Sequence, residues 1–139
     1  MPVAFRILPS RALVLVTYSG VAGLQETIER TAECARHPDF DLRYRHLVDV
    51  SRITGYERDF PGFFAMQAKV MESYPPQGQD QIFVFLAPTR QGQEMAQMVR
   101  RSWDGLNWAI VRIVEDEGQA LDLLGLREHS ISELLAEVG

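Results

Sequence analysis

The sequence is poor in the residues that build covalent or metal cross-links. Its 139 residues include one cysteine, Cys34, and three histidines. A single cysteine cannot form an internal disulfide and cannot supply a metal site alone. We expect Cys34 to be a small buried residue, because it lies on the apolar side of a predicted helix. The sequence thus predicts no metal site, and no motif in it predicts a cofactor.

Long apolar runs and positive charge are also scarce. No apolar stretch approaches the roughly 20 residues that a membrane-spanning helix requires. The first residues lack the basic start and apolar centre of a secretory signal. We therefore expect a cytoplasmic protein with no membrane span. The net charge of −5 argues against a nucleic-acid partner, because binding to a phosphate backbone depends on clustered lysine and arginine.

Catalytic motifs are missing as well. The glycines form no Walker loop, no G-x-S-x-G elbow and no G-x-G-x-x-G turn. His46 and Asp49 are close in the sequence, but residues three apart on a strand face opposite sides of a sheet. No nucleophile, base and orienting group occur together. The sequence therefore predicts a protein that is not an enzyme.

What the sequence does contain is an alternation of strand and helix patterns. Two short β-type runs on either side of the turn residues 9–11 predict an opening hairpin. Three further β-type runs are continuous apolar stretches, typical of strands covered on both faces, and amphipathic segments of helical period lie between them. The predicted strands cover residues 5–8, 12–18, 45–50, 81–86 and 108–113. A helix follows each of the last four, and a short capped helix begins near Ser130.

This order of elements predicts parallel pairing with crossover connections. The expected fold class is α/β, with a single mixed, mostly parallel sheet and helices on both faces. The N-terminal hairpin strand is expected at one edge, antiparallel to its neighbour. Residues 1–139 are expected to form one domain, with a core over about residues 4–126 and a helical tail over about residues 127–139.

The predicted second helix runs from Asp59, as its N-cap, to a proline pair, and is apolar around most of its circumference. At about 100° per residue, one apolar side is formed by Phe60, Phe63, Phe64, Gln67, Met71 and Tyr74. We expect this side to face the core. Met66 and Val70 then form an exposed stripe, which is typical either of a homodimer contact or of a surface covered by a neighbouring segment.

Ligands of open α/β sheets bind at the carboxyl ends of the strands. This rule points to three connections, at residues 49–59, 87–91 and 114–118. The first is the longest and most polar, and such loops often carry function. The alternative is a plain surface connection that ends in a helix cap. The candidate binding residues in this segment are Asp49, Ser51, Thr54, Tyr56, Arg58 and Asp59.

Three features carry a family resemblance: the hairpin, the run Leu47-Val48-Asp49-Val50, and residues 111–114 leading into residues 119–124. With them the chain resembles the STAS domain family, whose fold is that of bacterial anti-sigma-factor antagonists. It is most similar to a small, divergent, mostly uncharacterised bacterial branch that is often grouped with lipid-binding CRAL-TRIO domains. The resemblance covers about residues 5–126 and implies the α/β fold described above.

The resemblance also implies a switch. In regulatory members of the family, a serine or threonine that follows an aspartate at the start of the second helix is phosphorylated, and this changes partner binding. Here the stretch Asp59-Phe60-Pro61-Gly62 is similar to the family's Asp-Ser-Ser-Gly, but it carries no hydroxyl. Ser51 and Thr54 are the nearest hydroxyls and become the candidates for phosphorylation.

Two functions of different classes follow. The first is a non-enzymatic regulatory or protein-binding module that contacts a protein partner, or a second copy of itself, through residues 49–59 and the second helix. The alternative is a carrier or sensor of a small apolar or lipid-like ligand that binds beside the aromatic second helix.

Overall fold

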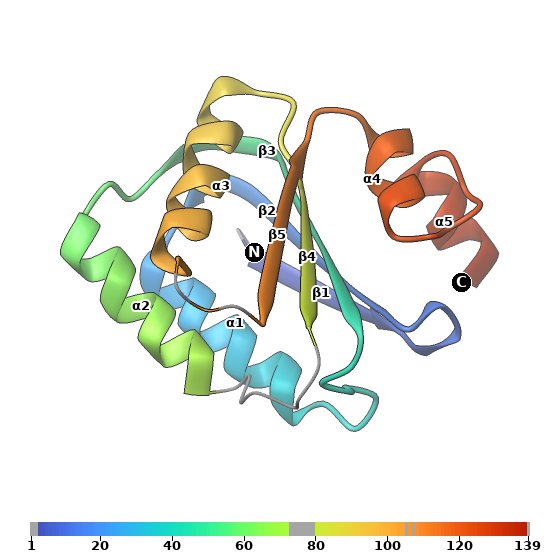
Figure 1. Ribbon diagram of the computed structural model, residues 1–139, viewed down its shortest axis with the longest axis horizontal. Helices are drawn as coiled ribbons and strands as arrows, with labels where there is room; N and C mark the ends of the chain where they lie inside the picture. The colour runs from blue at the N-terminus through green and yellow to red at the C-terminus, as the bar shows by residue number, and fades with distance from the viewer. Residues whose placement is uncertain (1–2, 73–79, 105, 107, 139) are drawn as a thin grey trace.

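The computed structural model describes residues 3–72, 80–104, 106 and 108–138, and Figure 1 shows the course of the chain. Within these residues a short 3₁₀ turn, Pro9–Arg11, joins the first two strands, and helices follow the later ones. The strands are β1 (Val3–Leu8), β2 (Leu13–Ala22), β3 (Arg45–Tyr56), β4 (Gln81–Leu86) and β5 (Ala109–Val114). The helices are α1 (Leu24–Arg36), α2 (Phe60–Glu72), α3 (Arg90–Ser102), α4 (Glu117–Leu123) and α5 (Ile131–Val138).

The strands form one mixed sheet in the order β1-β2-β3-β4-β5. β1 pairs antiparallel with β2, while β2, β3, β4 and β5 pair in parallel. The hairpin strand therefore lies at one edge, as the sequence predicts. Because the four parallel strands run in the same direction, their carboxyl ends share one edge of the sheet, where the connections to the following helices begin.

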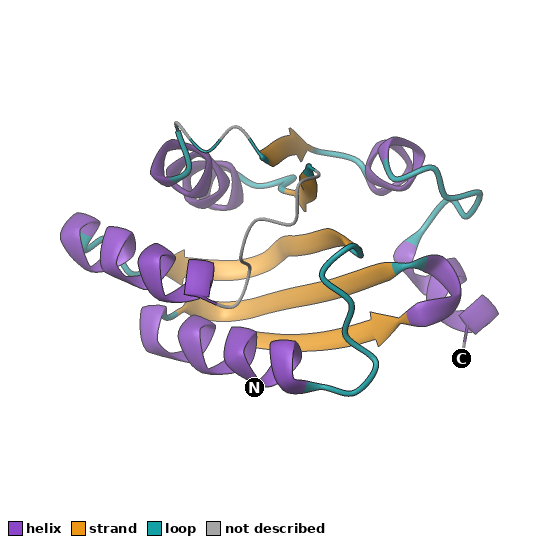
Figure 2. Cartoon of the chain, turned by 60° about the horizontal axis from the view of Figure 1, so that its bottom comes forward, coloured by secondary structure: helices purple, strands orange, loops and turns teal. Residues whose placement is uncertain are grey.

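Helices cover both faces of the sheet. Figures 1 and 2 show α1, α2 and α3 on one side and α4 and α5 on the other. Alternate residues of the central strands pack into these two layers. Val48 and Phe85 join the cluster beneath α1, α2 and α3, whereas Leu47 and Val84 join the cluster beneath α4 and α5. The α/β class with covered faces is therefore confirmed.

β2 and β3 are longer than predicted. The sequence indicates a break at Ser19-Gly20 and a loop from Ser51, but residues 19–22 pair in parallel with residues 52–56. Two register shifts and a positive φ of 65° at Gly20 accommodate these turn-type residues. Each extension supplies the backbone hydrogen-bond partners of the other, so neither extension can be predicted from its own residues alone. The prediction of a loop from Ser51 is therefore wrong for residues 51–56, which belong to β3, and holds for residues 57–59.

Capping side chains stand at the start of α2, α4 and α5, and the sequence predicts those at Asp59 and Ser130. The Asp59 carboxylate accepts a hydrogen bond from the Gly62 N–H at 3.2 Å, and Asp116 caps α4 by accepting from the Gln119 N–H at 3.1 Å. Ser130 Oγ accepts from the Glu133 N–H at 3.1 Å at the start of α5. These side chains satisfy backbone donors that a helix leaves unpaired in its first turn.

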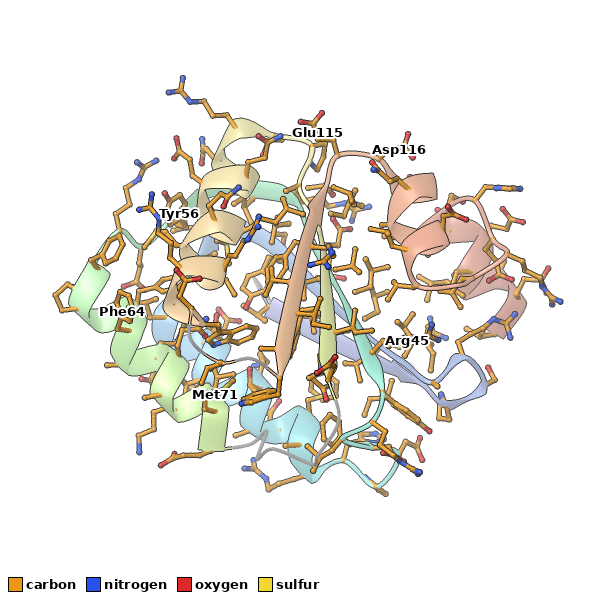
Figure 3. The ribbon with its side chains drawn as sticks, viewed as in Figure 1. Arg45, Tyr56, Phe64, Met71, Glu115 and Asp116 are labelled. Atoms are coloured by element: carbon orange, nitrogen blue, oxygen red, sulfur yellow. The ribbon has the colours of Figure 1, made fainter. Side chains whose placement is uncertain are left out.

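The C-terminal tail packs firmly on the α4 side of the sheet. Leu134 of α5 is fully buried, so the core, expected to end near residue 126, extends into this helix. The buried Glu128 carboxylate accepts from the Arg11 guanidinium at 3.2 Å. Arg45, labelled in Figure 3, donates to the backbone carbonyls of Arg11 and Leu124. These bonds join the hairpin to the end of α4.

The structure also bears on the scarce residues. Cys34 is buried, as expected, and burial raises the pKa of its thiol to about 12. Within the described ranges, no cluster of three or more histidine, cysteine, aspartate or glutamate side chains is placed to hold a metal ion. None of the helices in the described part of the chain is long and apolar enough to cross a membrane.

We predict that Val48→Asp unfolds the protein or lowers its free energy of unfolding by several kcal/mol. Val48 is buried beneath α1–α3, where a carboxylate has no partner to replace water. Urea unfolding followed by circular dichroism measures the effect. Thr54→Asp is the control, because Thr54 lies on the same strand but is exposed. A parental midpoint for Val48→Asp would contradict the covered position of β3.

Candidate functional site

The predicted site residues of segment 49–59 separate into four places. Asp49 is buried in β3, and its Oδ1 accepts from the Ser51 N–H at 2.9 Å. Thr54 is exposed on the same strand, while Asp59 caps α2. Tyr56 and Arg58 come together at the end of β3. The structure therefore does not assemble these residues into one polar loop site.

Tyr56 and Arg58 meet at Glu94 of α3, a residue that the sequence did not single out. The Tyr56 hydroxyl donates to Glu94 Oε2 at 3.2 Å, and Arg58 Nη2 lies 3.3 Å from the same oxygen. The Arg58 guanidinium also stacks over the Tyr56 ring at 4.7 Å. Arg90 approaches the other carboxylate oxygen of Glu94 at 3.5 Å. The end of β3 is thus attached to α3 by a charged cluster at the surface.

The other two predicted connections meet through Gln93. Its side-chain amide donates to the Ala87 carbonyl at 3.2 Å and to Glu115 Oε1 at 2.8 Å. Thr89, the N-cap of α3, accepts from the Gly92 N–H at 3.0 Å. In Figure 3, Glu115 and Asp116 lie well away from Phe64 of α2. Two consecutive residues of α3 thus bond to different connections: Gln93 to residues 87 and 115, and Glu94 to Tyr56 and Arg58.

α2 faces the core with a different side from the one predicted. Met66 and Val70, expected to be exposed, are only 5% and 7% exposed, whereas Phe60 and Phe64, expected to be buried, are 43% and 45% exposed. The predicted outward stripe is therefore wrong. Residues 63, 66, 67 and 70 also have helical core spacing, and the packing of α2 between α1 and α3 selects them. The inward positions of Phe63 and Gln67 are confirmed; Tyr74 lies outside the described residues.

The outer face of α2 carries an exposed aromatic pair. The rings of Phe60 and Phe64 lie 5.5 Å apart, one helical turn from each other. The pair lies within a few residues of Arg58, whose cluster with Tyr56 and Glu94 borders the start of α2. Aromatic side chains beside tyrosine and arginine are the composition typical of protein–protein contact surfaces. We call this set, Tyr56, Arg58, Phe60 and Phe64, the aromatic face.

The inner face of α2 lines a cavity. The cavity lies between the sheet and the layer of α1, α2 and α3 and has a volume of about 80 Å³. Its wall is mostly apolar and includes Phe63, Met66 and Val70 of α2 and Met95 and Val99 of α3. Glu57, Gly23 and Leu24 line it where the structure reaches the surface.

Three rings form part of the cavity wall. The His46 and Phe83 ring centroids lie 4.9 Å apart, and those of Phe83 and Trp103 lie 4.7 Å apart. Burial lowers the pKa of His46 to about 4, so its imidazole is neutral at neutral pH. The wall therefore presents neutral rings. The sequence carried a partial signal for this apolar wall, since the aromatic character of the second helix suggested an apolar ligand there.

Polar side chains interrupt this apolar wall, Tyr18, Thr27 and Gln67 among them. The buried Gln67 amide donates to Ser102 Oγ at 2.8 Å, and that hydroxyl donates to the Val99 carbonyl, so α2 is bonded to the end of α3. The buried indole Nε1 of Trp103 has no hydrogen-bond partner among the described residues. Sequence reasoning did not identify Trp103, because its isolated position on a helix face is typical of a core residue.

The comparisons with known proteins support a fold and no closer relationship. No protein-family model matches the sequence, and no curated protein matches it. The order of strands and the two helical layers define an α/β protein of the STAS-like class. A solved structure of the anti-sigma factor antagonist SpoIIAA in its unphosphorylated form is similar to it over 88% of this chain and 97% of that chain, with a TM-score of 0.52. Only 9% of residues are identical. The STAS-like fold predicted from the sequence is thereby confirmed.

We predict that His46 makes the protein less stable in mild acid. Its pKa in the folded protein, about 4, lies below its unfolded value of 6.5, so the unfolded chain binds more protons between these values. The stabilisation is fully present above pH 6.5 and is lost as the pH falls towards 4. Between pH 7 and pH 5 the free energy of unfolding should fall by about 1–2 kcal/mol from this residue.

Urea unfolding at several pH values measures this loss. His46→Gln should remove the decrease between pH 7 and pH 5, whereas His129→Gln, at an exposed position, should retain it. If the pH dependence of the His46→Gln protein equals that of the parent, His46 is not the group responsible.

Proposed function

We propose that this protein is a non-enzymatic regulatory module that binds another protein through its aromatic face. The observation that carries the proposal is the exposure of Phe60 and Phe64 on the outer side of α2. Large exposed aromatic side chains on an ordered helix are unfavourable in water unless something covers them. The similar solved structure is that of an anti-sigma factor antagonist. A protein of that name acts on another protein, and this supports the proposal of a regulatory contact here.

The aromatic face replaces the stripe of Met66 and Val70 as the contact surface. Tyr56 and Arg58, two of the residues predicted from segment 49–59, border the phenylalanine pair and are held in place by Glu94. An apolar centre with a polar, charged border is the usual construction of a specific contact. We propose that the partner is a different polypeptide. The experiment below distinguishes it from a second copy of this chain. A cytoplasmic location stays a prediction.

The test compares tagged chains expressed in cells of the source organism. After chemical cross-linking, the wild-type chain should retain at least one polypeptide that the Phe60→Glu, Phe64→Glu double variant loses at least tenfold, because aromatic contact residues carry most of the binding energy. Leu123→Glu is the matched control: Leu123 is 50% exposed and lies on α4, on the opposite side of the sheet.

The identity of the lost polypeptide decides between partners. Loss of a different protein supports the proposal, whereas loss of cross-links between copies of this chain makes the aromatic face a dimer contact. If every retained polypeptide is held equally by the double variant and by Leu123→Glu, the aromatic face is not a docking surface. Thermal unfolding of both variants confirms that they are folded.

We also propose that phosphorylation of segment 49–59 regulates the contact, and that Thr54 is the acceptor. Of the two hydroxyls predicted from the sequence, Thr54 is exposed and Ser51 is half-buried with its N–H bonded to Asp49. Phosphate would add nearly two negative charges to β3, two residues before Tyr56. Phosphopeptide mapping of the protein purified from its own host should find Thr54 modified. Phosphate only at other positions, or none, would refute this switch.

A second proposed function is the binding of a small apolar molecule in the cavity beneath α2. The specific observation is the apolar space of about 80 Å³, lined by four residues of that helix. This volume is about half of the roughly 150 Å³ that holds a benzene molecule in an engineered cavity. Of the ligand classes predicted from the sequence, we propose the small apolar one, because a lipid-like chain would extend beyond this space.

A further inference from the structure

The edge strand β5 has a row of backbone groups that its neighbour does not use. Among the described strands, β5 pairs only with β4, in an unbroken register along its six residues. At one end of this pair, the Gln81 N–H donates to the Trp108 carbonyl. At the other end, the Ala87 N–H donates to the Val114 carbonyl. In a parallel pair this pattern directs the backbone groups of even-numbered residues of β5 towards β4, and those of odd-numbered residues towards the free edge.

Val111 and Ile113 carry these outward groups. No acceptor for their N–H groups is found among the described residues. By contrast, the Ala109 N–H is bonded to the Leu106 carbonyl at 3.1 Å. The Val111 carbonyl accepts a hydrogen bond from the guanidinium of Arg112 at 3.3 Å, so this exposed side chain lies over the edge. Figure 2 shows β5 at the upper edge of the sheet, between α3 and α4, with no described strand beyond it.

β5 has few of the features that protect an edge strand from pairing. Its sequence, AIVRIV, contains no proline, and its pairing with β4 has no register shift. Its one charged residue is Arg112. At the opposite edge of the sheet, by contrast, Val3 of β1 donates its N–H to the Glu26 side chain of α1 at 3.3 Å. The β5 edge is therefore a template to which an extended segment can add as a strand.

The surface beside β5 is positively charged. A groove lies between the end of α3 and the first residues of β5, and it is lined by Arg100, Val111 and Arg112. Arg101 follows Arg100 on α3, and all three arginines are exposed and form no ion pair within the described ranges. The groove also contains one carboxylate, that of Asp104. In a chain with a net charge of −5, this local excess of positive charge favours an acidic occupant.

We propose that β5 binds an extended acidic segment of another polypeptide as an additional strand of the sheet. The N–H groups of Val111 and Ile113 donate to carbonyls of this segment, and one of its N–H groups replaces Arg112 at the Val111 carbonyl. The released guanidinium pairs with a carboxylate on the same face of the sheet. Ile110, half-buried on that face, contacts an apolar neighbour of the carboxylate. A second copy of this chain is a poorer occupant, because pairing two β5 strands brings the arginines of both copies together.

Three peptides of the length of β5, six residues, test the proposal. In the first, glutamate alternates with valine; the second has lysine in place of glutamate. The third is the first peptide with every backbone nitrogen methylated, which removes its donors and blocks strand pairing. The full chain, labelled with ¹⁵N, is titrated with each peptide. The acidic peptide should shift the amide signals of Val111 and Ile113 and slow the exchange of the Ile113 N–H with solvent. The methylated peptide should do neither.

Arg112→Glu reverses the charge on β5. It should weaken binding of the acidic peptide about tenfold and strengthen binding of the lysine peptide, because an attractive cross-strand pair becomes a repulsive one. Arg6→Glu is the matched control, since Arg6 is also an exposed arginine on an edge strand, at the opposite edge of the sheet. It should change neither affinity. If Arg112→Glu fails to fold, the comparison of the acidic and lysine peptides on the parent chain still decides the charge of the occupant.

Three outcomes overturn the proposal. If no peptide affects Val111 and Ile113, the edge does not accept a strand, and Arg112 only protects it from pairing. If the acidic and lysine peptides bind equally well, the occupant is not acidic. If slower exchange of the Ile113 N–H appears in the protein alone and increases with its concentration, the occupant is a second copy of this chain. None of these results bears on the aromatic face, whose variants lie on α2.

Discussion

Strand β3 is the element on which the rest of the structure depends. It pairs with β2 along most of its length and with β4 at residues 46–49, and its side chains are covered on both faces. Val50 is fully buried and approaches the start of α3, where Gly92 leaves no room for a side chain without displacing its neighbours. β3 therefore sets how closely α3 approaches the sheet. Through the bond between Tyr56 and Glu94 it also sets the position of the start of α2 relative to α3.

α2 carries two candidate sites on opposite sides. Phe60 and Phe64 face solvent, whereas Phe63, Met66, Gln67 and Val70 face the cavity. The helix is held at its start by the Asp59 cap and the Arg58–Glu94 pair, and farther along by the bond from Gln67 to Ser102. Because one helix forms part of both candidate sites, the proposed ligand and the proposed partner would contact the same element.

Charged groups have different tasks on the two sides of the sheet. On the α4 side, Glu128 is buried and paired with Arg11, and Arg45 bonds to two backbone carbonyls, so these charges hold the tail against the hairpin. On the α2 side, Glu94 is partly exposed and gathers Arg58, Arg90 and Tyr56. Exposed pairs of this kind contribute little stability but orient the side chains that surround a contact surface.

The sequence by itself determined the class of fold, the four parallel strands, the caps at Asp59 and Ser130, and the burial of Cys34. These features depend on local signals: apolar runs, turn residues and capping side chains act within a few residues of each other. Only the tertiary structure decided that β2 and β3 extend past Ser19 and Ser51, because each needs the other's backbone as a partner. It also decided which side of α2 is buried. A helix that is apolar nearly all round offers two stripes with the same period, and only its contacts with α1 and α3 distinguish Met66 and Val70 from Phe60 and Phe64.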